Sequence, residues 1–378
     1  MKGPHGPTLL DTMSQSAIVD RAIDAWMEED VDVVQETENY RRGTLKKITF
    51  IVILLFIAII AAGFAMSIGT YPIDFLDTYR IVWDHFFGEI QDADADYLIF
   101  EWRLPRICTG ILAGIGLAAA GVVMQSILRN PLADPYTTGI SSGASFGATL
   151  AIGFGISVAN GAYAIVIGAF VFSLIPTVVI LAVSKMRGAS PTTMIMAGIA
   201  VMYIFNAMTT MIKLFVSPDQ LAAIFAWSVG SIDGATWTQV GTMLTFVTVG
   251  YLVLQLSARK LNVLSTGDES SRSIGIDANK LRLVSLLVVS FLTAGVVSFT
   301  GLIGFIGLVS PHICRLVIGS DNRYLIPASA AFGAALLTIA DVIGRTVIQP
   351  STIQVGVITA FIGGPLFLYL IIKQRRGS

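Results

Sequence analysis

The sequence contains few charged residues. Of its 378 residues, 13% are Asp, Glu, Lys or Arg, well below the roughly 25% that a soluble domain usually carries. Hydrophobic residues make up 54%, and the mean hydropathy is +0.76. A chain of this composition is expected to lie in the cell membrane, in contact with lipid. Its formal net charge of −1 leaves no basic surplus for binding phosphates, so no nucleic-acid partner is expected.

Groups that carry out chemistry are also scarce. The two cysteines, Cys108 and Cys314, lie in apolar stretches without other metal ligands and without the density of a disulfide framework. We interpret them as packing residues. The sequence contains neither a GxxxxGKS/T phosphate loop nor an HExxH zinc motif. We therefore expect no catalytic residue, no metal and no cofactor in this chain.

Acidic residues are nearly absent from the apolar segments, which bears on the source of energy for transport. Proton- and sodium-driven transporters usually place carboxylates near the membrane midplane. Asp341 is the one acidic residue inside an apolar segment, and it lies four residues before Arg345, so the two can pair on one helix face. We interpret this pair as structural. The sequence thus favours a pore powered by a partner protein, with an ion-coupled secondary transporter of a small solute as the alternative.

Long apolar segments are abundant. A spanning helix needs about 20 mostly apolar residues, and ten segments qualify or nearly qualify. We therefore expect an all-α polytopic membrane protein with about ten transmembrane helices. Residues 45–376 form the expected membrane domain, and residues 1–44 an acidic cytoplasmic extension in which residues 16–29 have a weak amphipathic helical pattern. The ten segments are residues 45–67, 104–127, 137–157, 162–184, 191–215, 238–258, 281–301, 303–318, 325–345 and 354–372.

The positions of Lys and Arg predict the orientation of the chain. Four of them, within residues 41–47, precede the first segment and place the N-terminus in the cytoplasm. With ten crossings the C-terminus is cytoplasmic as well, and most of the 24 Lys and Arg residues then lie on the cytoplasmic side. The exceptions on the outer side are Arg80, Arg103, Arg106, Lys213 and Arg345.

Arg103 and Arg106 are the least expected of these exceptions. In the stretch "EWRLPRICTG" they flank Leu104 and Pro105, at the expected start of the second spanning helix. The helix macrodipole places partial positive charge at this end, so cations are disfavoured there. The sequence therefore indicates that the two arginines serve a specific purpose.

Glycines predict where helices pack and where they break. Gly110 and Gly114 form a GxxxG pair in the second segment, and further small residues follow, so we expect this helix to be central in the bundle. The stretch "GLIGFIG" at residues 301–307 separates the seventh segment from the eighth. Irregular backbone at membrane depth is tolerated when it is buried in protein or lines a cavity. Two interpretations stay open here, a tight packing joint and a hinge beside a pathway.

The longest cytoplasmic loop, residues 259–280, predicts a short helix. In "STGDESSRSIGID", Thr266 or Gly267 can start it, Asp268 and Glu269 fall in its first turn, and Gly275 can end it. A capped helix parallel to the membrane suits contact with a soluble subunit.

Several motifs resemble one protein family. They extend over residues 45–376, and their order resembles that of the FecCD-type permeases of ABC importers, which carry iron-siderophores, haem and vitamin B12. The motifs are "WRLPR", "GVVMQSILRNPLADPYTTGISSGASFG", "SVGSIDGATW", "GDESSRSIGI", "GLIGFIGLVSPHICRL", "DNRYLIPASAAFGAALLTIADVIGR" and "VGVITAFIGGPLFLYLI". The resemblance leaves the cargo open among these three classes.

The resemblance implies a fold and partners. It implies a type II ABC importer permease fold, a homodimer with the pathway at the subunit interface, two ATPase subunits that bind the ATP, and an extracytoplasmic substrate-binding protein.

The resemblance also implies site residues. Those that dock the binding protein through its glutamates are Arg103, Arg106 and Arg345. The alternative is local pairing with Glu101, Asp341 or the acidic residues 92–96, and both can hold in turn, with a resting pair exchanged on docking. The coupling residues for the ATPase are Gly267, Asp268, Glu269, Ser270, Ser271, Arg272, Ser273 and Gly275. The gate residues, in "GASPTTM", are Ser190, Thr192 and Thr193, although Pro191 departs from some relatives.

Overall fold

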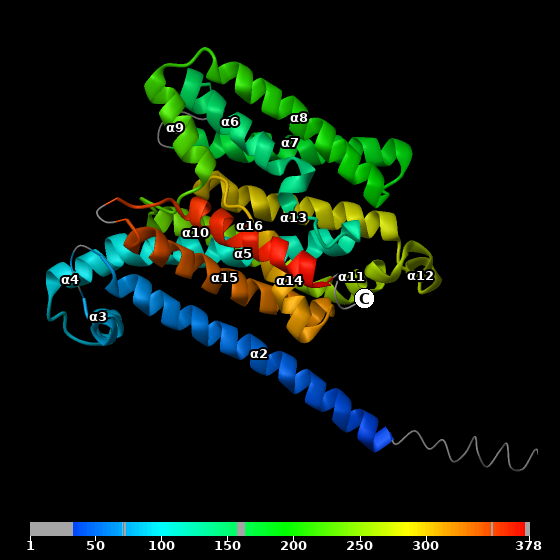
Figure 1. Cartoon of the computed structure of the whole chain (residues 1–378), viewed down its shortest axis with the longest axis horizontal. Helices are drawn as coiled ribbons and strands as arrows, with labels where there is room; N and C mark the ends of the chain where they lie inside the picture. Colours follow the sequence, from blue (N-terminus) through cyan, green and yellow to red (C-terminus); the bar gives the residue numbers. More distant parts are fainter. Residues whose placement is uncertain (1–32, 70, 72, 157–162, 349–350, 375–378) are drawn as a thin grey trace, which may run out of the picture. The chain divides into compact units, whose positions relative to one another are not determined.

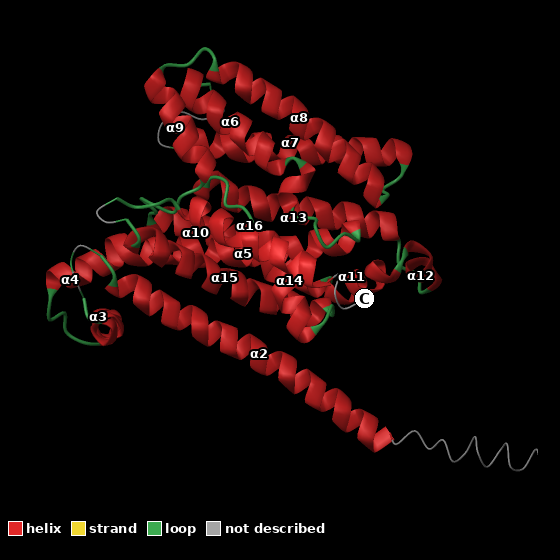
Figure 2. Ribbon diagram, viewed as in Figure 1, coloured by secondary structure: helices red, strands yellow, loops and turns green. Residues whose placement is uncertain are grey.

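The structure, a computed structural model, describes residues 33–69, 71, 73–156, 163–348 and 351–374. The regular elements in these ranges are all helices, as Figure 2 shows. The predicted all-α fold is confirmed. The elements are α2 (Val33–Ser67), α3 (Phe75–Phe87), α4 (Ala93–Tyr97), the π-helix η1 (Leu98–Arg103), α5 (Leu104–Leu128), the 3₁₀-helix η2 (Pro135–Thr138), α6 (Ile140–Phe154), α7 (Ala164–Arg187), α8 (Pro191–Lys213), α9 (Pro218–Val229), α10 (Trp237–Leu256), α11 (Ala258–Thr266), α12 (Asp268–Ser273), α13 (Ala278–Thr300), α14 (Ile306–Ile318), α15 (Asn322–Thr346) and α16 (Val355–Gln374).

Seven described helices are long and apolar enough to cross a membrane. They are α2 from Glu38 onward, the continuous helix Ala93–Leu128, α7, α8, α10, α13 and α15. The third, eighth and tenth predicted segments contain shorter apolar helices, which are α6, α14 and most of α16. The protein is therefore a multi-pass membrane protein.

The chain divides into two units, residues 1–49 and 50–378. In the first unit, the described residues form the start of α2, where Arg42 and Glu38 pair one turn apart at 2.7 Å. The predicted amphipathic helix at residues 16–29 lies outside the described residues.

In the second unit, α13 lies between two groups of helices (Figure 1). On one side it packs against α6 and α7, which associate with α8 and α9. On the other side it packs against α5 and α10, and α5 also contacts α14 and α15. Helix α13 thus connects the two groups.

Helix α5 is central in the second unit, as predicted from its glycines. Its apolar window is the most buried of the seven. A Cβ added to Gly114 would lie 2.4 Å from the carbonyl oxygen of Gly333 in α15. A Cβ added to Gly121 would lie 1.8 Å from that of Gly307 in α14. The helix backbones approach so closely because these positions carry no side chain.

The two ends of α5 depart from regular helix. At its start, η1 is a π-helical turn in which the N–H of Leu104 bonds to the carbonyl of Ile99, and such turns often occur at functional sites. At its end, Arg129 has φ +48° and its N–H bonds to the carbonyls of Gln125 and Ser126. Left-handed backbone is uncommon for a residue with a side chain. An arginine therefore lies at each irregular end of α5, Arg103 at the start and Arg129 at the end.

The predicted break between the seventh and eighth segments is present at residues 301–305. Gly301 has φ +66° and ends α13, and Phe305 has φ +68° and precedes α14. The Ser231 N–H donates to the carbonyl of Thr300 at 2.8 Å, and the hydroxyl of Tyr136 donates to that of Ile303 at 3.0 Å. The irregular backbone is thus held by neighbouring segments.

The same break lines an open cavity of about 660 Å³. Its walls come from η2, the start of α6, the end of α9 and the start of α16, and they are mostly apolar with two serines, Ser141 and Ser228. The segment is therefore a tight packing joint and also part of a cavity wall.

Candidate functional sites at the two faces of the helix bundle

The three arginines predicted to dock a partner lie at one face of the bundle. Arg103 is the last residue of η1, Arg106 lies in the first turn of α5, and Arg345 lies in the last turn of α15. Asp341, one turn before Arg345, and Asp233, in the loop between α9 and α10, lie with them. We call these five residues the Arg106 cluster.

Arg106 is paired with two carboxylates. Its Nε and Nη2 donate to Oδ1 of Asp341 at 2.9 and 2.7 Å, and its Nη1 donates to Asp233. The Asp341 side chain is 3% exposed, whereas that of Asp233 is 43% exposed. Arg106 itself is 18% exposed. One of its two partners is therefore fixed inside the protein, and the other is accessible from outside.

Arg345 links Asp341 to the end of α2. Its Nε lies 3.0 Å from Oδ2 of Asp341, as the sequence spacing predicted. Its two terminal nitrogens donate to the carbonyls of Ala65 and Ile68, at 2.9 and 3.0 Å. Ala65 lies in the last turn of α2 and Ile68 directly follows the helix, where carbonyls lack intrahelical donors.

Arg103 also binds the end of α2. It donates to the carbonyl of Tyr71 at 2.5 Å, to that of Ser67 at 3.4 Å and to that of Met66. The C-terminal end of a helix carries partial negative charge, so a cation there is favourable. The positive charge of Arg103 is unfavourable at the start of α5, but its contact with the negative end of the α2 dipole offsets this cost.

The structure brings the three predicted arginines together and pairs two of them locally. Arg106 and Arg345 bind Asp341, which is one of the local partners considered from the sequence. The sequence interpretation missed Asp233, although the predicted topology places the "SIDG" loop at the same face. It also missed the carbonyls of α2, because a backbone acceptor leaves no trace in the sequence.

The acidic residues 92–96 do not pair with these arginines. Asp92 caps α4 by accepting from the N–H groups of Asp94 and Ala95 at 3.1 and 3.0 Å. Asp96 pairs with Nδ1 of His85 at 2.8 Å. Of the local partners considered from the sequence, Asp92 and Asp96 therefore do not bind the arginines, because they bind groups within the segment between α2 and α5.

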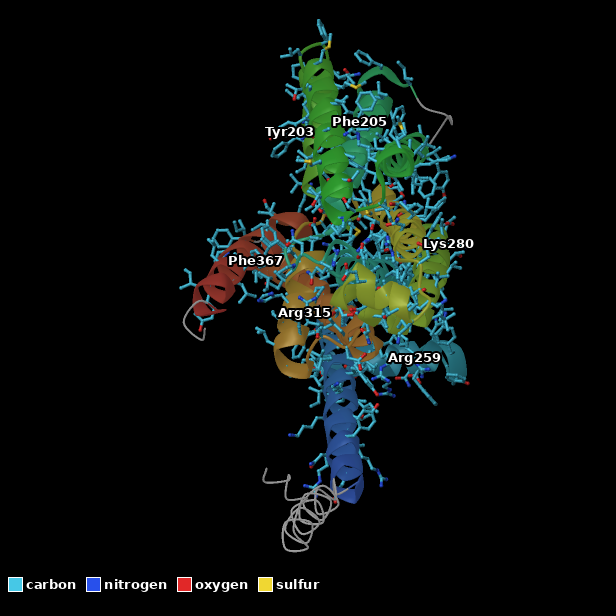
Figure 3. All side chains as sticks on the ribbon, turned by 90° about the vertical axis from the view of Figure 1, so that its right-hand side faces the viewer. Tyr203, Phe205, Arg259, Lys280, Arg315 and Phe367 are labelled. Atoms are coloured by element: carbon cyan, nitrogen blue, oxygen red, sulfur yellow. The ribbon has the colours of Figure 1, made fainter. Side chains whose placement is uncertain are left out.

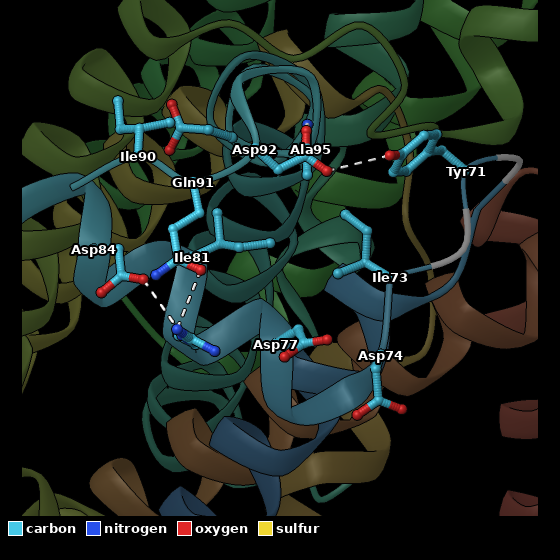
Figure 4. A pocket seen from close by; sticks show the side chains of 12 residues that line it. Tyr71, Ile73, Asp74, Asp77, Ile81, Asp84, Ile90, Gln91, Asp92 and Ala95 are labelled. Atoms are coloured by element: carbon cyan, nitrogen blue, oxygen red, sulfur yellow. Dashed lines mark hydrogen bonds and ion pairs between the residues drawn. The ribbon is translucent and has the colours of Figure 1, made fainter. Parts of the chain in front are cut away.

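That segment encloses an acidic pocket of about 310 Å³ (Figure 4). Tyr71, which lines it, donates to Asp92 at 3.3 Å. Arg80, another lining residue, donates to Gln91 at 3.1 Å. The charge of Asp92 raises the pKa of the Tyr71 hydroxyl. The pocket therefore adds negative charge beside the Arg106 cluster.

Helix α12 lies at the opposite face and corresponds to the short helix predicted there. Gly267 precedes it with φ +137°, which favours glycine, and Gly275 follows it with φ +79°. The Ser271 hydroxyl is buried and donates to the carbonyl of Gly267 at 2.8 Å. The predicted coupling residues that remain exposed are Glu269, Ser270, Arg272, Ser273 and Gly275.

Asp268 faces the protein instead. Its carboxylate accepts from the guanidinium of Arg282 and lies 3.1 Å from Nη2 of Arg129. The hydrogen bond from Arg282, together with the positive charges of Arg282, Arg129 and Arg272, holds the pKa of Asp268 below its usual value. Asp268 therefore belongs to the attachment of α12 rather than to its exposed surface.

The predicted gate residues form the start of α8. Ser190 is the N-cap: its Oγ accepts from the N–H of Thr193 at 3.1 Å and lies 2.8 Å from the Thr193 hydroxyl. Pro191 occupies the first helical position, where its fixed φ is favourable, so it fits this helix start. Thr192 is exposed. The hydroxyls of Ser190 and Thr193 therefore fix the start of the helix.

Helix α8 also carries an exposed apolar face. Phe205 is buried and Tyr203 is exposed, and the two lie on opposite sides of the helix (Figure 3). Further large apolar residues are exposed along α8 and α16, namely Ile204, Met208, Met211, Phe361 and Leu368. Surfaces of this kind contact lipid or another protein.

Known proteins resemble this chain over most of its length. A sequence model described as the FecCD transport family matches residues 51–373. The hemin transport system permease protein of Yersinia pestis is 34% identical over 326 residues, which are 85% of this chain and 95% of that protein. The cobalamin import system permease protein of Halobacterium salinarum is 40% identical over 279 residues, which are 73% of this chain and 74% of that protein.

A solved structure is similar as well. It is described as an inward-facing conformation of a metal-chelate type ABC transporter and superposes with a TM-score of 0.76 at 28% identity. The match covers 86% of this chain and 99% of that one.

Proposed function

Because this chain belongs to the FecCD transport family, we propose that it is the membrane-spanning permease of an ABC importer that carries an iron-siderophore, haem or cobalamin-type solute into the cell. The observation that carries the proposal is the family match over residues 51–373. The cavity beside the break at residues 301–305 supports a pathway, since its mostly apolar wall offers little to hold a solute.

The proposed topology has ten crossings with both termini in the cytoplasm. Three crossings use the shorter apolar helices α6, α14 and α16. Residues 45–376 then form the permease domain, and residues 1–44 a cytoplasmic extension. The excess of Lys and Arg on the cytoplasmic side supports this orientation. The Arg106 cluster is then external, and α12 is cytoplasmic.

The proposed cytoplasmic partners are two ATPase subunits, which hydrolyse the ATP. Each would contact α12 through the exposed coupling residues Glu269, Ser270, Arg272, Ser273 and Gly275, with Gly267, Asp268 and Ser271 holding the helix in place. The start of α8, with Ser190, Thr192 and Thr193, is the proposed cytoplasmic gate. The exposed apolar residues of α8 and α16 support a second copy of this chain as a further partner.

The proposed external partner is a substrate-binding protein that docks on Arg103, Arg106 and Arg345. Arg106 is the residue best placed to exchange partners, because Asp233 is accessible and Asp341 is not. A carboxylate of the docked protein would replace Asp233 at Nη1 and accept the same charge-assisted hydrogen bond, while Nε and Nη2 stay on Asp341. Arg103 and Arg345 would stay on the end of α2 and hold Arg106 in position.

An ion-coupled secondary transporter is the alternative class. It would need a carboxylate that binds and releases its ion at membrane depth. Asp341 is bound by Arg106 and Arg345, so it is poorly suited to that task.

Reconstitution with the cognate ATPase and binding protein tests the function. In proteoliposomes, uptake should require ATP and the loaded binding protein, and it should not respond to a proton or sodium gradient. Binding titrations with ferric siderophores, haem and cobalamin then identify the cargo. Uptake that follows an ion gradient without ATP would show that the chain is a secondary transporter.

A further inference from the structure

Arg282 is a fully buried cation at the cytoplasmic end of α13. Its side chain is 0% exposed, and arginine is almost never buried to this extent unless it is paired. The sequence gives no hint of this burial, since Arg282 lies in "NKLRL", where an exposed basic residue at a membrane edge is expected.

The guanidinium of Arg282 joins three segments that are distant in the sequence. Its Nε donates to the carbonyl of Ile127 in α5 at 3.0 Å, and its Nη1 donates to that of Ala189 at 3.3 Å. Nη1 also donates to Oδ2 of Asp268 at 3.0 Å, and Nη2 donates to Oδ1. We call Arg282, Asp268, Ile127, Ala189 and Arg129 the Arg282 junction.

Each acceptor lies at a helix end. Ile127 is the second-to-last residue of α5, whose last carbonyls lack intrahelical donors. Ala189 is buried and directly precedes Ser190, the N-cap of α8. Asp268 is the first residue of α12. A displacement of any of the three helix ends therefore changes the bonding of the same guanidinium.

The three segments differ in their access to a partner. Asp268 is 31% exposed and belongs to a six-residue surface helix whose other side chains largely point outward. Ile127 and Ala189 are buried. A protein bound to α12 can therefore move Asp268 directly, and Arg282 links this carboxylate to the segment before α8.

From this arrangement we propose that Arg282 is a positioning residue of the transport cycle, which transmits movement of α12 to the start of α8. The inference rests on the proposed function and assigns that function a residue outside the predicted coupling and gate sets. The planar guanidinium suits this task, because its nitrogens hold the carboxylate and the two carbonyls in fixed relative directions. Lysine, a compact cation on a flexible stem, would keep the charge but lose that geometry.

The experiment follows the proposed gate by chemical labelling. Cys108 and Cys314 are replaced by alanine, and Thr192→Cys is introduced as an exposed reporter. In the complex with the ATPase, maleimide labelling of this cysteine is compared without nucleotide and with ATP and vanadate. Transport per ATP hydrolysed is measured in parallel for Arg282→Gln, Arg282→Lys and Asp268→Asn. Arg41→Gln, an exposed arginine of α2, is the control for the loss of one positive charge.

We expect the nucleotide-dependent labelling change in the parent protein and in Arg41→Gln, and its loss in Arg282→Gln and Arg282→Lys. Transport per ATP should fall by about 5- to 150-fold, the usual range for coupling between two sites. Basal ATP hydrolysis should stay within about twofold, since the ATPase carries out the chemistry. A residue with only a structural role would lower the amount of complex without changing this ratio.

If the Arg282 variants do not form the complex with the ATPase, Asp268→Asn tests the role of Arg282 instead. It keeps the bonds of Arg282 to Ile127 and Ala189 and weakens only the link to α12, so it should uncouple an intact complex. The inference is overturned if Asp268→Asn and an assembled Arg282→Gln both keep the labelling change and the transport ratio of Arg41→Gln. Labelling that is unaffected by nucleotide in the parent protein, despite ATP-driven uptake, would overturn the gate assignment and this inference but not the proposed function.

Discussion

The Arg106 cluster and the Arg282 junction are buried charge centres at opposite faces of the bundle, with opposite composition. In the cluster, a buried carboxylate, Asp341, is held by Arg106 and Arg345. In the junction, a buried guanidinium holds Asp268 and two backbone carbonyls. In both, one carboxylate is more exposed than the buried charge, namely Asp233 at 43% in the cluster and Asp268 at 31% in the junction. A buried charge thus fixes each centre, and an accessible partner connects it to the surface.

The two centres differ in the structural element that carries the more exposed carboxylate, which is a loop for Asp233 and a helix for Asp268. Asp233 lies in a loop and binds Arg106, so the proposed docking protein would displace a side chain without moving a helix. Asp268 belongs to a helix and carries that helix with it. The first centre suits exchange of partners, and the second suits transmission of movement.

The largest expected effect is a difference in stability between variants of the buried Asp341 and of the exposed Asp233. Asp341→Asn removes the counter-charge of Arg345 and leaves Arg106 with only the exposed carboxylate of Asp233. Breaking a buried pair costs about 3–5 kcal/mol of unfolding free energy. Asp233→Asn breaks a more exposed pair and should cost at most about 1 kcal/mol. Thermal and denaturant unfolding of the purified protein measure both. Equal stability of the two variants would remove the distinction between a fixed and an exchangeable partner.

The next effect tests the packing of α5, the helix that runs from the Arg106 cluster to the Arg282 junction, against α14. Gly121→Ala places a Cβ against the carbonyl of Gly307 and should destabilise by about 1–3 kcal/mol, the usual cost of overpacking. Gly241→Ala is the matched control, because its Cβ meets nothing within 4 Å. Helix propensity predicts a gain of up to about 1 kcal/mol there. Similar stability of both variants would contradict the close α5–α14 contact.

A smaller effect tests the exchange at Arg106. Asp233→Asn removes the competing carboxylate, so the binding protein should dock more tightly. Because an exposed ion pair contributes about 0.2–1 kcal/mol, the half-saturating concentration for stimulation of ATP hydrolysis should fall by about 1.5- to 5-fold. Arg106→Gln should abolish the stimulation and leave basal hydrolysis intact. Weaker docking by Asp233→Asn would show that Asp233 contacts the partner directly.

The smallest effect concerns acid stability at the face of the bundle that carries α12. Burial raises the pKa of Asp321, but hydrogen bonds from Arg323 and Asn262 outweigh it and lower the pKa to about 2. Because the folded-state pKa lies below the unfolded value of about 3.9, this carboxylate stabilises the fold at neutral pH. That contribution is lost as the pH falls from about 4 to about 2. Asp321→Asn should flatten the pH dependence of the melting temperature in this window, and an unchanged profile would refute the assignment.

Local patterns in the sequence predicted the elements on which the sites are built. Apolar length located the helices, the glycines of the second segment predicted its central position, and "TGDESSRSIG" predicted α12. The pair Asp341–Arg345 followed from helical spacing. Such features depend on residues within a few turns of each other, so the sequence carries them directly.

Long-range partners could not be predicted in the same way. Arg103 binds carbonyls at residues 66–71, and Arg282 binds one at residue 127 and another at residue 189. Every residue except proline offers a similar N–H and carbonyl, so nothing in the sequence marks an acceptor. The π-helical turn before α5 is equally unmarked.

The sequence by itself determined that this protein lies in a membrane, which segments form its helices and which arginines are out of place. Only the tertiary structure decided which groups satisfy those arginines, and only it showed that Arg282 is buried as well. The physical reason is that a buried cation must be paired wherever the fold places it. Its partners are then whichever helix ends the packing brings within reach, and for Arg103 and Arg282 these are the ends of other helices.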